Sequence, residues 1–202
     1  MRVLQVCNSG TGRIAKAGCV VAYEICNSAF LVPYEQTGLN PYDMRVKCAK
    51  PPLCYDFSGV GKFLERPEVR TALNIRTDAG EWQSCNFNVN RAFMGDWMKN
   101  YQYQIPDLLA HGIRVLIYAG DQDYICNWLG NQAWAKAMEW PGKDAFNKAK
   151  MAPFGPAAQP AGELWSASNF SFLRVYAAGH MVPLDQPNAS LAMVDAFIQG
   201  KI

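Results

Sequence analysis

The stretch IRVLIYAGDQD, residues 113–123, decides the fold class. Its first six residues are mostly apolar or β-branched and do not alternate regularly with polar residues. A run of this kind predicts a strand that is buried on both faces, as in a parallel sheet. Asp121 and Asp123 follow directly, so the pattern predicts an acidic loop at the carboxyl end of a buried strand.

The same order of features recurs nearer the C-terminus. Residues 172–176 (FLRVY) predict a second strand, and residues 177–183 (AAGHMVP) place His180 in a tight loop after it. The order strand, helix, strand, helix predicts an α/β fold with a parallel sheet. Because open α/β sheets bind ligands at the carboxyl ends of their strands, Asp123 and His180 are expected on one edge.

Helices are predicted on either side of the second strand, over 127–140 and from Pro187 onward. The face of the later helix that is expected to pack on the sheet consists of Leu191, Val194, Phe197 and Ile198. A shorter helix over 105–110 is expected to end near His111 and Gly112, because glycine can take the left-handed cap conformation. Pro, Gly and Lys residues between 141 and 162 predict loops.

Asp123 and His180 can form a general-base pair, in which the carboxylate fixes the histidine tautomer and stabilises the imidazolium. In α/β-hydrolases the catalytic residues follow the chain order nucleophile, acid, histidine. Asp121 competes with Asp123 for the acid role, and either residue could instead be a solvated loop carboxylate. His111, beside a glycine at an expected helix end, is interpreted as a cap residue.

The sequence contains no nucleophile elbow of the common α/β-hydrolase kind. No serine has glycine two positions before it, so the Gly-x-Ser-x-Gly pattern does not occur. Ser58, in DFSGVG at 56–61, is the nearest lookalike, but its neighbours favour a helix start. Cys126 could be proposed as a nucleophile, but its closeness to Asp123 favours a position in a pocket wall. No Cys-x-x-Cys pair occurs, and His111 and His180 are far apart in the sequence, so we expect no zinc site. We also expect no cofactor.

Composition bounds the class of protein. The chain has 202 residues, of which 50% are hydrophobic and 18% charged, with a net charge of +2, which predicts a soluble globular protein. Basic clusters and apolar runs of about 18 residues are not apparent, so neither nucleic acid nor a membrane is expected as a partner.

The cysteines point to an oxidising compartment. Six of the seven fall in the first 85 residues, where residues 1–56 predict irregular loops and short helices. The first ten residues do not resemble a signal peptide. This combination leads us to expect further sequence upstream of residue 1. The seven cysteines stand at positions 7, 19, 26, 48, 54, 85 and 126.

Several spaced motifs resemble the serine carboxypeptidase family, and the resemblance covers nearly the whole chain. The motifs are CNFNVN at 85–90, GDWM at 95–98, LIYAGDQD at 116–123, ICNWLG at 125–130 and GHMVP at 179–183. The resemblance implies the C-terminal part of an α/β-hydrolase fold. It also implies a cysteine-rich cap insertion over 1–100 and the hydrolase core over 101–202.

The same resemblance assigns roles to particular residues. Asp123 and His180 match the acid and the histidine of the catalytic triad, which leaves Asp121 with a structural role. Cys126 and Met181 match residues that line the substrate site. The family cysteine pattern implies the disulfides Cys7–Cys19 and Cys48–Cys54, with Cys26 and Cys85 paired to cysteines outside this sequence.

The resulting hypothesis is a serine-type carboxypeptidase that releases C-terminal amino acids from peptides through an acyl-enzyme. The serine would lie on an N-terminal half, either upstream or on a separate chain. The alternatives are a catalytically inactive binding or scaffold protein and a truncated gene product. The family implies a vacuolar, lysosomal or secreted location, which two glycosylation sequons, at Asn169 and Asn188, would suit.

Overall fold

The computed structural model describes residues 2–51 and 53–202, which form two compact units. Unit 1 comprises Met1–Phe30 and Cys48–Lys99, and unit 2 comprises Leu31–Lys47 and Asn100–Ile202. A boundary near residue 100 was expected from the family resemblance, but residues 31–47 belong to the second unit. Whether the units correspond to the cap and core regions of a hydrolase stays a prediction.

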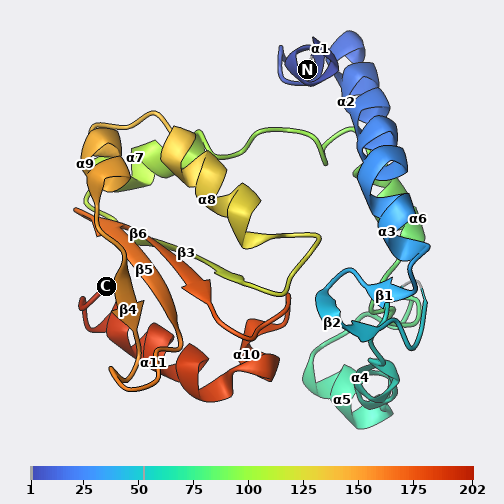
Figure 1. The fold of residues 1–202 in the computed structure, drawn as a ribbon. Coiled ribbons are helices and arrows are strands. Elements are labelled where there is room, and N and C mark those ends of the chain that lie inside the picture. The colour runs from blue at the N-terminus through green and yellow to red at the C-terminus, as the bar shows by residue number, and fades with distance from the viewer. Residues whose placement is uncertain (1, 52) are drawn as a thin grey trace. The chain divides into compact units, whose positions relative to one another are not determined.

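Unit 2 contains a four-stranded mixed sheet with the strand order β3-β6-β5-β4 (Figure 1). Strands β3 (Val115–Gly120) and β6 (Phe170–Val175) are parallel, which confirms the predicted parallel pair. The antiparallel strands β5 (Gly162–Ala167) and β4 (Ala152–Phe154) complete the sheet. Strand β4 lies in the segment predicted as loop. Its signal is weak because it is a three-residue edge strand that contains a proline.

Helices cover both faces of this sheet. Figure 1 shows α7 (Gln104–Ala110), α8 (Trp128–Ala137) and α9 (Lys143–Lys148) on one face. Helices α10 (Val182–Asp185) and α11 (Pro187–Ile198) lie on the other. The segment predicted as loop therefore also contains α9.

Strand β6 divides the apolar core of unit 2 in two. Phe170 and Phe172 point into a cluster with residues of α7, α8 and α9, while Leu173 and Val175 point into a cluster with β4, α10 and α11. All four side chains are at most 2% exposed. Alternation between two apolar environments explains why the strand sequence shows no polar face.

The predicted packing face of α11 was wrong. Met193 is buried at 3% exposure and packs on the sheet, whereas Leu191 and Ile198 are 72% and 70% exposed. Apolar residues occur nearly all round this helix, so its periodicity fits more than one face. Met193 is the residue of this helix that packs in one buried cluster with Leu173 and Val175.

Unit 1 is helical and carries both disulfides. Cys7 is bonded to Cys19, and Cys48 to Cys54, which confirms the two predicted pairs. Cys26, Cys85 and Cys126 have free thiols. The helices of unit 1 are α1 (Arg2–Cys7), α2 (Arg13–Cys26), α4 (Ser58–Leu64), α5 (Pro67–Ala72) and α6 (Phe87–Ala92).

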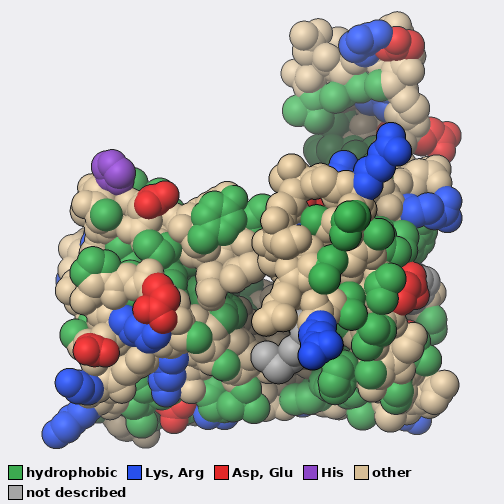
Figure 2. All heavy atoms as spheres, turned by 90° about the horizontal axis from the view of Figure 1, so that it is seen from above, with side chains coloured by type: hydrophobic (Ala, Val, Ile, Leu, Met, Phe, Trp, Pro, Cys, Tyr) green, Lys and Arg blue, Asp and Glu red, His purple; other side chains and the backbone are tan. Residues whose placement is uncertain are grey.

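Helix α2 continues through the π-helical turn η1 (Asn27–Leu31) into α3 (Val32–Glu35). The run Arg13–Glu35 has 23 residues and a mean hydropathy of 1.3 in its most apolar window, which is long and apolar enough to cross a membrane. The expectation that no stretch approached this length was therefore wrong. Core helices of soluble proteins meet the same test, so the length alone assigns no location. Figure 2 shows hydrophobic side chains interspersed with charged ones on the face viewed.

Candidate active site

Asp123 lies in the loop that follows β3 and is 3% exposed. Its Oδ1 atom accepts a hydrogen bond of 3.1 Å from the backbone N–H of Cys126. Its Oδ2 atom lies 2.8 Å from Nδ1 of His180, which is 57 residues further along the chain. A buried carboxylate bonded to Nδ1 fixes the orientation of the ring and leaves Nε2 available.

His180 lies in the loop that follows β6, and its side chain is 37% exposed. The hydrogen bond that His180 makes to Asp123, followed by that to the Cys126 side chain, raises the pKa of His180 from 6.5 to about 10. Partial desolvation opposes the shift because burial disfavours the imidazolium.

The ends of the two parallel strands bring these loops together. The backbone N–H of Asp121 donates to Val175 O at 2.9 Å, and that of Gln122 donates to Ala178 O at 2.8 Å. A Cβ atom on Gly120 would lie 2.3 Å from Ala178 O, so this approach requires glycine. The shared strand edge that the sequence predicted is therefore present.

Asp121, the alternative acid, has a different environment. Its Oδ2 atom lies 3.5 Å from the Arg174 guanidinium, which also pairs with Glu163 at 3.2 Å. Arg174 is further held over the ring of Trp128 at 4.1 Å. Asp121 thus belongs to an ion-pair network, and Asp123 alone of the two is bonded to His180.

Cys126 and Met181, the expected substrate-lining residues, lie beside the pair. Cys126 is exposed, and its side chain is hydrogen-bonded to His180. Met181 directly follows His180 and stands at the N-cap position of α10. Donor atoms of Asp123, Cys126 and His180 lie within 4.8 Å of one another. Such a donor set could bind a soft metal ion, but Nδ1 of His180 is already hydrogen-bonded to Asp123.

Two other sequence interpretations can be compared with the structure. His111 is the C-cap of α7, with Nδ1 2.7 Å from Asp107 O, and Gly112 has φ +75°, which confirms the predicted helix end. Residues Pro41–Arg45 contact both loops of the candidate site, a role that the sequence did not indicate. For residues 1–56, which include this segment, the sequence predicted only irregular loops and short helices.

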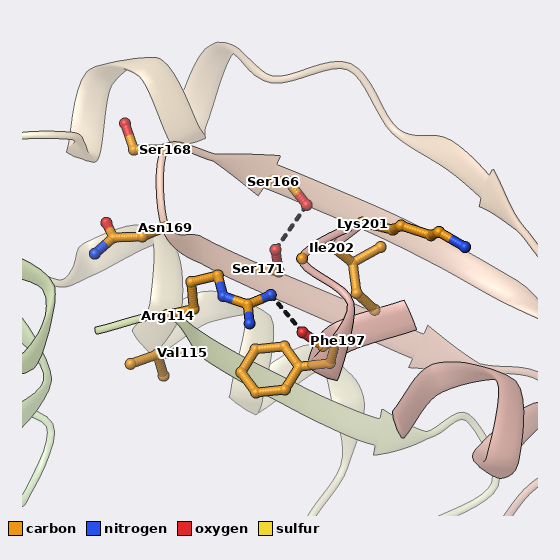
Figure 3. A pocket seen from close by; sticks show the side chains of 10 residues that line it. Arg114, Val115, Ser166, Ser168, Asn169, Ser171, Phe197, Lys201 and Ile202 are labelled. Carbon is orange, nitrogen blue, oxygen red and sulfur yellow. Dashed lines mark hydrogen bonds between the residues drawn. The ribbon is translucent and has the colours of Figure 1, made fainter. Parts of the chain in front are cut away.

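A separate hollow of about 180 Å³ lies at the opposite end of the parallel strands (Figure 3). Arg114 lies there with its guanidinium donating to Phe197 O, and Ser166 is bonded to Ser171 at 2.8 Å. Each of these three side chains already has a hydrogen-bond partner, and the hollow is remote from the strand ends that carry Asp123 and His180.

Comparison with known proteins identifies the family. The family model described as "Serine carboxypeptidase" matches residues 4–200. The chain belongs to the serine carboxypeptidase family. Carboxypeptidase Y of Candida albicans is 48% identical over 185 residues, which cover 90% of this chain and 34% of that protein. Carboxypeptidase Y homolog A of Leptosphaeria maculans is 47% identical over 187 residues, with the same coverage.

A solved serine carboxypeptidase structure also resembles this chain. The crystal structure of Kex1(delta)p, a prohormone-processing carboxypeptidase from Saccharomyces cerevisiae, gives a TM-score of 0.67 at 27% identity. The match covers 80% of this chain and 36% of that one. The fold is therefore that of part of a serine carboxypeptidase, an α/β-hydrolase-type fold. The chain spans about a third of the length of the curated relatives it matches.

Proposed function

We propose that this chain supplies the acid and the histidine of a serine-type carboxypeptidase site. The observation that carries the proposal is the 2.8 Å contact between buried Asp123 and His180 at the carboxyl ends of parallel strands. The substrate class is peptides and proteins with a free C-terminus. The serine would come from an N-terminal half outside this sequence. Among the described residues β3 is an edge strand of the sheet, and this supports such a partner because the unpaired backbone groups of an edge strand can bond to a further strand.

The pair would act first as a base and then as an acid. Neutral His180 takes the proton of the serine hydroxyl as the oxygen attacks the C-terminal peptide carbonyl. The imidazolium then protonates the leaving amino group, so the C-terminal residue departs and an acyl-enzyme remains. Water then attacks the acyl-enzyme through the same base and acid steps, and the acyl group leaves the serine as a carboxylic acid. Asp123 stabilises the imidazolium at each stage. Cys126 and Met181 would contact the substrate on either side of the cleaved bond.

We also propose a vacuolar, lysosomal or secreted location. Two disulfides support it, because such bonds persist in oxidising compartments. Asn188 is the better glycosylation site, since it is exposed in the first turn of α11. The Asn169 amide donates to Leu109 O and Ile113 O at 3.0 and 2.9 Å. Glycosylation can be tested by expressing the protein in a secretory host and measuring whether glycosidase treatment lowers its mass.

The decisive experiment compares the two histidines. The chain is prepared with its native N-terminal half, and a fluorophosphonate probe reports the activated serine. We expect His180→Gln to lower labelling and release of C-terminal residues by about 10³-fold or more, as for loss of a triad member. His111→Gln, at a helix end, should leave both unchanged. Failure of the wild-type preparation to label would contradict the proposal and favour the non-catalytic alternative.

A further inference from the structure

The segment Pro41–Arg45 holds the loop that carries Asp123. Pro41 O accepts hydrogen bonds from the backbone N–H groups of Tyr124 and Ile125, at 3.1 and 3.0 Å. On the preceding side, the N–H of Met44 donates to Gln122 O at 2.9 Å. Backbone atoms on both sides of Asp123 are therefore bonded to one short segment from a distant part of the chain.

The same segment holds the loop that carries His180. Tyr42 O accepts a hydrogen bond of 2.7 Å from the N–H of His180, and the Tyr42 ring lies edge-on to the imidazole at 5.4 Å. A Cβ atom on Gly179 would lie 2.3 Å from Tyr42 O, so only glycine permits this approach. Arg45 adds a bond of 2.7 Å from Nη1 to Ala177 O.

Arg45 is itself fixed by two carboxylates. Asp43, 6% exposed, receives Nε and Nη2 at 2.8 and 2.7 Å, a bidentate contact that lowers the pKa of the Asp43 carboxyl. Asp185 lies 3.3 Å from Nη2 and also accepts a bond of 2.6 Å from the N–H of Gly179. A guanidinium held in this way presents a rigid donor to Ala177 O.

We propose that Arg45 is a positioning residue that, through the Pro41–Arg45 segment, locks the acid loop and the histidine loop at hydrogen-bonding distance. It touches neither reacting group. Its guanidinium ties the backbone three residues before His180 to the segment that holds Asp123. The inference builds on the proposed function, but it concerns the geometry of the pair and can be tested without peptidase activity.

The test is an NMR titration of His180 in the full chain. Arg45→Gln removes the bidentate contact and the bond to Ala177 O, so the loops should separate and Asp123 should hold the imidazolium less tightly. We expect the proton affinity of His180 to fall at least ~10-fold, with loss of the downfield proton signal of the Nδ1–H to Asp123 bond. Arg45→Lys keeps the positive charge but lacks the two parallel donors of the guanidinium, so it should recover part of the proton affinity of His180.

Arg114→Gln is the matched control, because Arg114 also donates to backbone carbonyls, those of Phe197 and Ile198, but at the other end of the sheet. It should leave the His180 titration unchanged. An unchanged titration in Arg45→Gln, with the fold intact by backbone amide spectra, would overturn the proposal. If Arg45→Gln does not fold, Asp185→Asn serves instead. It keeps the Asp43–Arg45 contact and should lower the affinity less, and no change in that variant would equally overturn the proposal.

Activity provides an independent readout in the assembled enzyme. A positioning role predicts that Arg45→Gln lowers kcat while KM stays within about twofold, because ground-state binding of the peptide does not involve Arg45. Absence of peptidase activity in the wild type would contradict the proposed function alone. The NMR result would still decide the positioning role.

Discussion

Units 1 and 2 are stabilised by different means. In unit 2, phenylalanine, leucine, valine and methionine side chains fill two clusters on the two faces of β6. In the described part of unit 1, the buried apolar side chains are those of cysteines and alanines alone: Cys7, Ala15, Cys19, Ala22 and Cys54. Unit 2 therefore depends on burial of apolar area, whereas unit 1 depends on covalent cross-links. The candidate catalytic pair lies in the unit with the larger core.

The strongest test of this difference removes a large side chain from each unit. Phe172→Ala, at 0% exposure in unit 2, should lower the free energy of unfolding by about 3–5 kcal/mol. Phe63→Ala, at 51% exposure in unit 1, should change it by less than about 0.5 kcal/mol. Urea denaturation of the two variants measures both values. Equal losses would show that the units do not differ in their reliance on burial.

The next largest effect is expected from the cross-links. Replacing Cys7 and Cys19 together by serine opens a disulfide with a sequence separation of 12, which should remove about 2–4 kcal/mol of stability. Hydrogen exchange should become faster in 2–30, while β3 and β6 keep their protection. Cys85→Ser, at an exposed free thiol, is the control. Loss of protection in β3 and β6 would contradict independent stabilisation of the two units.

The sequence predicted unit 2 better than unit 1 for a physical reason. Strands β3 and β6 can be recognised from the sequence because burial on both faces requires a continuous apolar run. The same runs placed Asp123 and His180 on one edge, since residues after parallel strands share that edge. The packing face of α11 was wrong because Leu191 and Met193 are equally apolar, and the space beside β6 decides between them.

The segment that bridges the two loops had no comparable signal. Its bonds run between backbone atoms, and Arg45 reaches Ala177 across 132 residues of sequence. Sequence periodicity does not reveal contacts between residues so far apart along the chain. In retrospect the sequence offered one clue, because Asp43 and Arg45 lie two residues apart on a short strand, β2 (Asp43–Lys47), which pairs with β1 (Leu39–Asn40). Even this clue predicts only the local ion pair of Asp43 and Arg45, and not the bond from Arg45 to Ala177 O.

The smallest expected effect is a dependence of stability on pH that should be found in unit 2 and not in unit 1. The pKa of His180 is raised to about 10 by Asp123 and then Cys126, against an ordinary value of 6.5. Because the folded-state pKa is the higher one, the pair stabilises unit 2 fully below about pH 6.5 and progressively less as pH rises through about 10. The His180 side chain is 37% exposed, so solvent screening keeps this contribution small.

Comparison of wild type with His180→Gln isolates this contribution, because all other titratable groups are common to both proteins. The difference in their free energies of unfolding should be largest below about pH 6.5 and shrink as pH rises through about 10. Hydrogen exchange in 2–30 should show no matching difference, since unit 1 contains neither member of the pair. A difference that stays constant with pH would mean that His180 is held by packing, and that its charge contributes nothing to unit 2.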